Sequence, residues 1–304
     1  MSEYDDADTM ELPTPLPAKP WPKTASSLVI VDLGACSHQG KVRTNNEDSF
    51  LVLRLERSLQ TLLTNLPADL PAKTTEIGYC MLVADGVGGA AGGEIASSTA
   101  ISTLIELVLQ TPDWHMRLDN EGANEVLARL DQRFGRLREA LIERAQAEPS
   151  LAGMGTTMTL AVSHATNLVI AHIGDSRAYL FHEGQLHLLT RDQTVAQDLA
   201  ELGVIRPEDV AKHPGRHVLT GAIATSGEEA QAEFHQVWLE DGDQVLLCTD
   251  GLTEMVTEAA IAEVLERAGP AGDICRALVD LALEGGGEDN VTVVLGRYSI
   301  PEEH

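Results

Sequence analysis

Runs of apolar residues divide the chain into short strands and a few longer helices. Branched apolar runs bounded by turn residues predict strands at 28–35, 49–55, 79–84, 157–163, 168–173, 177–181, 185–189, 233–239, 244–248 and 291–298. Apolar residues three and four positions apart predict helices at 94–110, 124–148, 194–202, 257–268 and 273–283. Strands 233–239 and 244–248 are expected to form a hairpin around Asp241-Gly242, and residues 57–76 a long surface excursion.

Composition predicts one folded domain with an unstructured start. The chain has 304 residues, of which 43% are hydrophobic, enough to bury a large core. Residues 1–25 are acidic and then proline-rich, so we expect a flexible tail there and a single domain over 26–300. Residues 190–232 interrupt the strand pattern and are expected to form a mobile insert in that domain.

Charge and cysteine usage restrict the partners and the compartment. The formal net charge is −26, which argues against a nucleic-acid backbone as ligand, because that needs a basic stripe. No apolar run approaches the ~18 residues of a membrane span, and no signal pattern is present. The four cysteines are scattered and are expected to be reduced residues of the core. A cytoplasmic protein with no nucleic-acid or membrane partner is therefore expected.

Three predicted apolar strands end on a carboxylate beside glycine. These carboxylates are Asp85, Asp175 and Asp250, and Asp289 precedes the last strand. If the strands lie side by side, the four side chains share one cavity, where they cannot all ionise without cations between them. A pair of divalent ions is the usual solution, and such ions prefer oxygen ligands. Each carboxylate alone fits a structural role, and the segment after Asp85 alone fits a glycine-rich turn equally well.

A second concentration of functional groups precedes strand 49–55. Arg43 stands four residues before the adjacent carboxylates Glu47 and Asp48. Seen alone, this segment fits an exposed polar turn. Of the histidines, His213 and His217 are four apart, but Pro214 and Gly215 between them argue against a helical metal pair. His172, within an apolar strand, is expected to be a satisfied core residue.

Taken together, these motifs resemble the metal-dependent serine/threonine protein phosphatases of the 2C type, in their bacterial branch. The matching pieces are Arg43-x-x-Asn46-Glu47-Asp48, Asp85-Gly86-Val87-Gly88-Gly89, Gly155-Thr156-Thr157, Gly174-Asp175-Ser176-Arg177, Thr249-Asp250-Gly251 and Asp289-Asn290. They occur in the family's order over residues 30–298. The resemblance implies an α+β fold: a two-sheet antiparallel β-sandwich with helices on both outer faces.

The resemblance also implies a reaction and a set of ligands. The reaction is hydrolysis of phosphoserine and phosphothreonine in proteins by a metal-activated water at a centre of two Mn²⁺ or Mg²⁺ ions. Carried over by motif, the metal residues are Asp85, the Gly86 carbonyl, Asp250, Asp289, Glu47 and Asp48, with Asp175 and Asp250 supporting a third, weaker site. Arg43 would bind the phosphate, which suits a planar cation, and it joins Asp48, Asp85 and Asp250 as the catalytic set.

Two positions depart from the family. Val87 stands where many eukaryotic members have the His proposed as general acid, so the leaving-group proton donor is unassigned. Gly221 stands where bacterial members often have Arg, at the end of the insert that the family calls the flap. Substrate selection is therefore open there.

Other functions remain as alternatives. One is a phosphoprotein-binding pseudophosphatase without activity, which the intact carboxylate set disfavours. Another is a metal-dependent hydrolase of small phosphoesters or nucleic acid, and a third is a phosphatase of a sigma-factor regulatory protein. The flap-sized insert favours an enzyme that opposes a eukaryotic-type serine/threonine kinase. No long apolar stripe is left after the core is counted, so a monomer is expected.

Overall fold

The computed structural model describes residues 25–63, 73–88, 92–110, 120–227 and 230–301, and the side chains of α2 from residue 128 onward. The predicted tail lies almost entirely outside these residues. No helix in the described part of the chain is both long enough and apolar enough to cross a bilayer.

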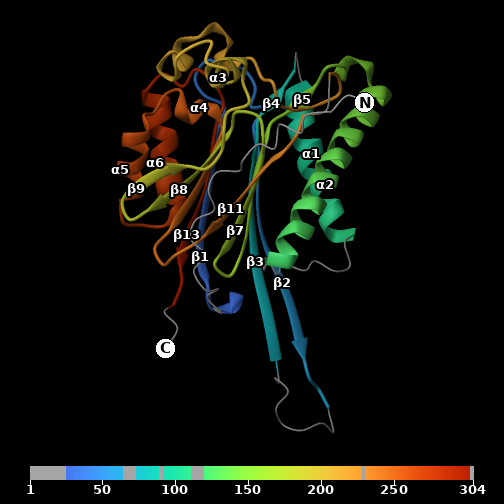
Figure 1. The fold of residues 1–304 in the computed structure, drawn as a ribbon, viewed down its shortest axis with the longest axis vertical. Coiled ribbons are helices and arrows are strands. Elements are labelled where there is room, and N and C mark those ends of the chain that lie inside the picture. The colour runs from blue at the N-terminus through green and yellow to red at the C-terminus, as the bar shows by residue number, and fades with distance from the viewer. Residues whose placement is uncertain (1–24, 64–72, 89–91, 111–119, 228–229, 302–304) are drawn as a thin grey trace, which may run out of the picture.

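Two five-stranded antiparallel sheets form the centre of the protein (Figure 1). The first sheet has the order β1-β13-β12-β8-β9, with β1 Ile30–His38, β13 Val291–Ser299, β12 Gln244–Cys248, β8 Arg177–His182 and β9 Gln185–Leu188. The second has the order β11-β7-β6-β3-β2, with β11 Glu233–Trp238, β7 Asn167–Ile173, β6 Met158–His164, β3 Lys73–Ala84 and β2 Ser49–Gln60. The predicted antiparallel β-sandwich is confirmed.

Successive side chains of β3 enter two different hydrophobic cores, one between the sheets and one under the helices. Met81 and Val83 pack between the two sheets, against residues such as Leu247 of β12. Cys80 and Leu82 point the other way and pack under the helices. Because successive strand residues face opposite sides, one buried strand builds two cores. This explains why the sequence reads as a continuous apolar run at 79–84.

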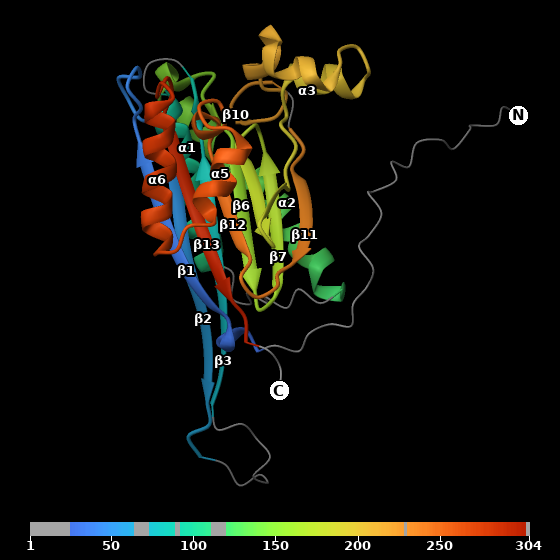
Figure 2. The ribbon, with the colours of Figure 1, turned by 90° about the vertical axis from the view of Figure 1, so that its left-hand side faces the viewer.

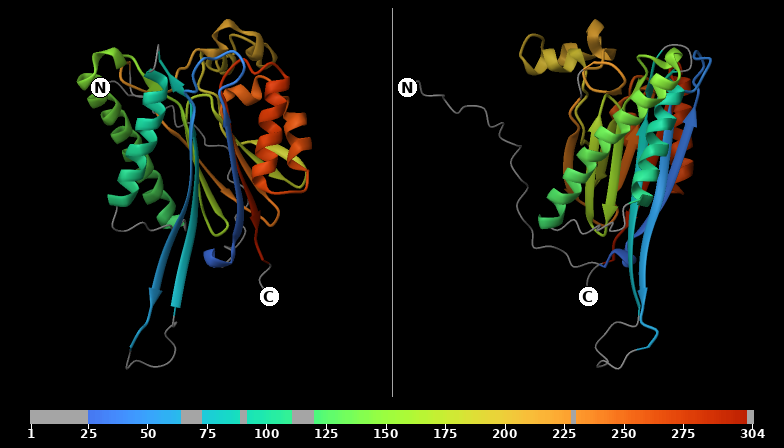
Figure 3. Two further views of the ribbon diagram at one scale, coloured as in Figure 1. Left: turned by 180° about the vertical axis from the view of Figure 1, so that it is seen from behind. Right: turned by 90° about the vertical axis from the view of Figure 1, so that its right-hand side faces the viewer.

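Helices cover both outer faces, as Figure 3 shows from two further sides. α1 Gly92–Gln110 and α2 Asn120–Ala147 pack on the β11-β7-β6-β3-β2 sheet, with Leu104 and Leu137 in the shared core. α5 Glu258–Leu265 and α6 Ala271–Glu284 pack on the other sheet. The short helix α4 Asp250–Thr253 follows β12 directly and joins the same core through Leu252.

The insert between β9 and β11 lies at one end of the sandwich (Figure 2). It contains α3 Val195–Glu201, the 3₁₀ turns η3 Pro207–Lys212 and η4 Pro214–His217, and β10 Ile223–Ala224. β10 pairs with β5 Gly155–Thr156, which pairs with β4 Gly86–Val87. This small third sheet ties the end of the insert to the segment after β3. The opposite end of the molecule carries the projecting β2–β3 hairpin.

One expectation about connections was wrong. Strands β11 and β12 do not form a hairpin: β11 pairs with β7, whereas β12 pairs with β8 and β13 in the other sheet. All five residues of β12 are buried, so it needs neighbours on both sides, and Gly242 at φ +86° directs the chain from one sheet to the other. The surface excursion expected at 57–76 begins and ends as strand, because β2 and β3 stay paired from Ser49↔Ala84 to Gln60↔Lys73, with residues 57–60 exposed.

Candidate metal centre

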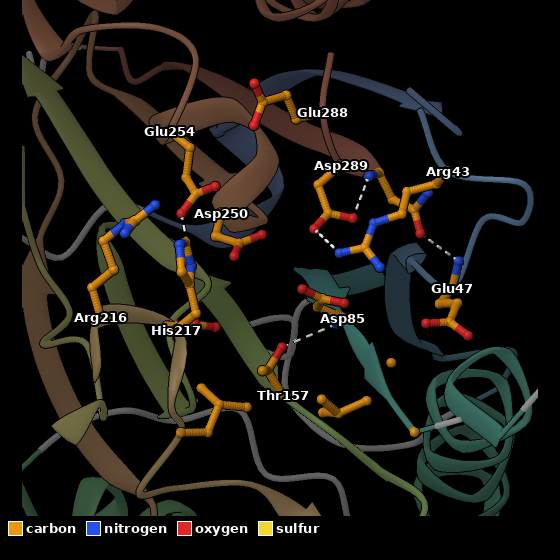
Figure 4. A pocket seen from close by; sticks show the side chains of 16 residues that line it. Arg43, Glu47, Asp85, Thr157, Arg216, His217, Asp250, Glu254, Glu288 and Asp289 are labelled. Atoms are coloured by element: carbon orange, nitrogen blue, oxygen red, sulfur yellow. Dashed lines mark hydrogen bonds and ion pairs between the residues drawn. The ribbon is translucent and has the colours of Figure 1, made fainter. Parts of the chain in front are cut away.

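A pocket of about 510 Å³ lies beside the insert, which contributes Arg216, His217 and Leu219 to its lining. Its lining comes from segments that are far apart in the sequence. These residues are Arg43, Glu47, Asp85, Gly86, Val87, Gly88, Thr157, Asp175, Arg216, His217, Leu219, Asp250, Glu254, Glu288, Asp289 and Asn290. In Figure 4 the side chains of Asp85, Asp250 and Asp289 face one another across this space. The four carboxylates that the sequence predicted to converge therefore line one cavity.

Backbone contacts fix Asp85 at the end of β3. Its amide donates to Thr157 Oγ1 at 3.0 Å, while its carbonyl accepts from the Thr157 amide at 2.8 Å and from Thr156 Oγ1 at 2.9 Å. Thr157 Oγ1 also lies 3.0 Å from Ser176 Oγ, beside Asp175. The Gly-Thr-Thr motif thus positions the carboxylates that follow β3 and β7.

Close backbone approach explains two glycines of the loop after Asp85. A Cβ on Gly86 would lie 2.1 Å from the Gly93 carbonyl oxygen, and one on Gly93 would lie 2.7 Å from the Gly86 carbonyl oxygen. The Gly86 amide donates to the Glu47 carbonyl at 3.2 Å. The start of α1 is therefore packed directly against the pocket, with room only for glycine.

Burial and mutual repulsion make the carboxylate group unfavourable on its own. One oxygen each from Asp85, Asp175 and Asp250 lie within 4.8 Å of one another. Burial, followed by the charges of Asp48 and Asp250, raises the pKa of Asp85 well above its ordinary value. Burial, followed by the charge of Asp175, does the same to the pKa of Asp250, and burial raises the pKa of Asp175 to about 7. Such a group accommodates its charge only with cations between its members.

Asn290 holds the Arg43–Asp48 segment against Asp289. Its Oδ1 accepts from the Glu47 amide at 2.8 Å, and its Nδ2 donates to the Gln39 and Asn45 carbonyls, both at 2.8 Å. Arg43 Nη2 donates to Asp289 Oδ2 at 2.5 Å, and this hydrogen bond raises the pKa of Arg43. Arg43, Glu47 and Asp289 therefore stand together at one wall of the pocket.

Asp48 lies behind the pocket wall instead of lining it. Its Oδ2 accepts from Thr249 Oγ1 at 2.9 Å, whereas its buried Oδ1 has no hydrogen-bond partner. Burial raises the pKa of Asp48 to about 7, although hydrogen bonds from Thr292 and Thr249 oppose the shift. Asp48 therefore adds a like charge close to Asp85 and Asp250, which raises the pKa of both.

The pocket also contains residues to which the sequence assigned no role. Arg216 and His217 come from η4, Glu254 follows α4, and Glu288 precedes Asp289. Glu254 stands four residues after Asp250, so a helix prediction there would have placed both on one face. Nothing in the sequence ties His217 to them, because that contact depends on how the insert folds back.

His213 and His172, the two other histidines that the sequence singled out, have structural contacts. His213 Nδ1 accepts from the Gly215 amide at 3.0 Å, so it caps η4 and does not pair with His217. His172 is fully buried and contacts Thr159 Oγ1 and the carbonyls of Gly174 and Arg191, at 2.9, 3.0 and 2.9 Å respectively. Its expected place in the core is confirmed.

The donor set fits hard divalent cations. The pocket presents carboxylates from several strand ends, and Asp250 Oδ1 and Asp48 Oδ1 are buried without a hydrogen-bond partner. Buried carboxylate oxygens without partners are costly unless they bind a cation. Oxygen-only ligation is what Mn²⁺ and Mg²⁺ prefer.

Comparison with known proteins agrees with this site. Residues 71–278 match the family described as Protein phosphatase 2C. The chain is 35% identical over 268 residues to the serine/threonine protein phosphatase PstP of Mycobacterium tuberculosis, covering 88% of this chain and 45% of that protein. It is 33% identical over 223 residues to the serine/threonine phosphatase stp of Listeria innocua, covering 73% of this chain and 86% of that protein.

Solved structures show the same fold. The crystal structure of M. tuberculosis PstP matches with a TM-score of 0.71 at 33% identity, covering 88% of this chain and 99% of that one. The PstP catalytic domain in complex with two manganese ions matches with a TM-score of 0.69 at 32% identity, covering 89% and 99%. The chain belongs to the protein phosphatase 2C family. It spans less than half the length of PstP.

Proposed function

We propose that the protein hydrolyses phosphoserine and phosphothreonine in proteins at a centre of two Mn²⁺ or Mg²⁺ ions. The convergence of Asp85, Asp250 and Asp289 in one pocket, with Arg43 at its wall, carries this proposal. Asp85, the Gly86 carbonyl, Asp250 and Asp289 would hold the ions, with Glu47 at the edge of the site. Bound divalent ions lower the pKa of a coordinated water and neutralise charge on the phosphoryl oxygens.

The chain's own residues account for binding and orientation. Arg43 is 55% exposed in its side chain, so its guanidinium can bind a phosphoryl group with two parallel hydrogen bonds. The Thr156 and Thr157 contacts keep the Asp85 carboxylate fixed. Val87 lines the pocket and has no group that could protonate the leaving oxygen, so that donor stays unassigned.

Partners follow from the same proposal. The substrates would be phosphorylated proteins, and we infer a serine/threonine kinase as the opposing enzyme, a cytoplasmic location and a monomeric state. The acidic composition, with a net charge of −26, supports a protein substrate over a nucleic acid. A pseudophosphatase is disfavoured because Asp85, Asp250 and Asp289 all line the pocket.

The test is hydrolysis of p-nitrophenyl phosphate and of phosphothreonine peptides with Mn²⁺, with Mg²⁺ and with EDTA. We expect metal-dependent turnover that disappears in EDTA and in Asp289→Asn. The exposed Asp273→Asn, which lies in α6 away from the pocket, is the matched control and should retain activity. If the folded protein turns over neither substrate with any divalent ion, the proposed phosphatase activity is refuted. The phosphoprotein-binding alternative then remains.

A further inference from the structure

Arg191 joins the insert to the β-sandwich through three carboxylates. It lies at the start of the insert, and its guanidinium contacts Asp198 and Glu201 of α3 and, at 3.5 Å, Glu233 of β11. α3 belongs to the insert, whereas β11 is the strand into which the insert leads. One side chain therefore connects the helix of the insert to the core of the protein.

The core side of this contact is held by further hydrogen bonds. The Arg191 carbonyl lies 2.9 Å from Nε2 of His172, which is fully buried in β7. Glu233 pairs with His172 in the register of β11 and β7, and it accepts from Gln193 Nε2 at 3.4 Å. The Gln193 amide in turn donates to the Gly174 carbonyl at 2.7 Å. Loss of the Arg191 side chain is therefore expected to release α3 and to leave β11 in place.

α3 supports the part of the insert that lines the pocket. The amide of Val195, the first residue of α3, donates to the Val218 carbonyl at 2.9 Å, and α3 also packs against η4. Arg216 and His217 of η4 line the pocket (Figure 4), as does the nearby Leu219. A shift of α3 would therefore move this wall of the pocket.

The charges around α3 balance only while Arg191 is present. The carboxylates of Asp198, Glu201 and Glu233 surround one guanidinium, so their mutual repulsion is unopposed once that positive charge is lost. An arginine suits this position because it presents five N–H donors in a rigid plane. The hydrogen bond between Arg191 and Glu201 raises the pKa of the guanidinium and lowers the pKa of the carboxyl group.

We propose that Arg191 is a positioning residue that holds the insert wall of the pocket in place for phosphorylated protein segments. It acts through α3 and η4 and not on the reacting atoms. A small phosphoester needs only the ions and Arg43, whereas a protein segment around a phosphothreonine also lies against the insert. For its kinetic readout, this inference rests on the proposed phosphatase function.

Steady-state kinetics on two substrates tests the role of Arg191. Arg191→Gln should raise KM for a phosphothreonine peptide by about tenfold with little change in kcat, because the lost contacts are with bound substrate. The kinetic constants for p-nitrophenyl phosphate should stay within about twofold of wild type, since this substrate does not reach the insert. Arg191→Lys keeps the charge without the planar fork and should recover part of the loss.

Arg206→Gln is the matched control. Arg206 belongs to the same insert and also pairs with two carboxylates, but these are Glu208 and Asp209 of the adjacent η3. This variant loses the same charge without releasing α3 from the sandwich, so KM for the peptide should stay unchanged. An equal rise of KM in both variants would contradict a specific role of Arg191.

Amide hydrogen exchange gives a readout that does not depend on activity. In Arg191→Gln, exchange in α3 should be faster by about tenfold or more through local opening, while exchange in β6 stays as in wild type. Adding Asp198→Asn and Glu201→Gln should restore part of the protection, because the repulsion between the carboxylates is removed.

The outcomes separate this inference from the proposed function. Unchanged exchange in α3, or an equal loss of activity on both substrates in Arg191→Gln, would overturn the role of Arg191 and leave the phosphatase activity standing. Wild-type protein that hydrolyses neither substrate would refute the phosphatase activity, and exchange in α3 would then decide whether Arg191 holds the insert.

Discussion

Arg43 and Asp289 form a hydrogen-bonded ion pair of 2.5 Å across 246 positions of sequence. The pair joins the proposed phosphate-binding cation to a proposed metal ligand. A cation bound to Asp289 would compete for the same carboxylate. Substrate and metal binding are therefore expected to be coupled through these two residues.

Loss of Arg43 should weaken substrate binding. We expect Arg43→Ala to raise KM by about tenfold or more, because a hydrogen bond to a charged group contributes about 1.5–3 kcal/mol. Arg54→Ala, an exposed β2 residue paired with Glu56, is the matched control and should leave KM unchanged. An unchanged KM in both variants would contradict the role of Arg43 in binding the phosphate. The measurement is steady-state hydrolysis of p-nitrophenyl phosphate.

Asn290 should be important for stability, not only for activity. Asn290→Ala removes three hydrogen bonds of 2.8 Å and leaves the Glu47 amide without its partner. We expect the free energy of unfolding to fall by about 2–4 kcal/mol, from net values of about 1 kcal/mol for each bond plus an unsatisfied donor. Urea unfolding measures this. Asn167→Ala, whose contact to Gln236 is exposed, should cost much less.

Gly221 and Gln193 should be energetically coupled at the base of the insert. A Cβ at position 221 would lie 1.7 Å from Gln193 Oε1, which accepts from the Gly174 amide at 3.1 Å. We expect Gly221→Ala to destabilise the fold by about 1–3 kcal/mol through overpacking. Combined with Gln193→Ala, it should cost less than the sum of the single changes, because the clashing side chain is gone.

A double-mutant cycle by urea unfolding gives this coupling. Gly272→Ala is the control, since a Cβ there meets no atom within 4 Å and the residue lies in α6. Strict additivity of Gly221→Ala and Gln193→Ala would contradict the contact. The close approach of the Gln193 side chain explains why glycine, and no larger residue, stands at position 221.

The metal-free protein should lose stability as pH rises from about 4 to about 7. Burial raises the pKa of Asp48 and of Asp175 to about 7, so the folded state holds protons that the unfolded state has already released. Stability is therefore greatest below the unfolded pKa and falls until the folded pKa is passed. Thermal unfolding in EDTA across this range measures the effect.

Metal should reverse this pH dependence. Mn²⁺ at about 100 times its dissociation constant adds about 2.7 kcal/mol, and it binds the ionised carboxylates. The gain in unfolding temperature should thus grow with pH and be smaller in Asp250→Asn. A gain that is independent of pH would contradict metal binding at the buried carboxylates.

The sequence predicted the parts of the site that depend on local pattern. Asp85, Asp175 and Asp250 each follow an apolar strand, and all three line one pocket. Their strands are not neighbours, because β6 separates β3 from β7 and β12 belongs to the other sheet. The pairing of β11 was missed because a turn such as Asp241-Gly242 does not reveal which sheet the chain enters. The contact between His217 and Glu254 was not predicted, because it depends on the long-range folding of the insert.

Cations held by Asp85, Asp250 and Asp289 are expected to be required for phosphate release. The most direct measurement is a Mn²⁺ titration of the metal-free protein that follows bound metal and phosphate release from one phosphothreonine peptide in the same samples. We predict that release begins as Mn²⁺ fills the site, and that Asp85→Asn binds less metal and releases no phosphate. Phosphate release from metal-free protein, or wild-type activity in Asp85→Asn, would contradict the claim.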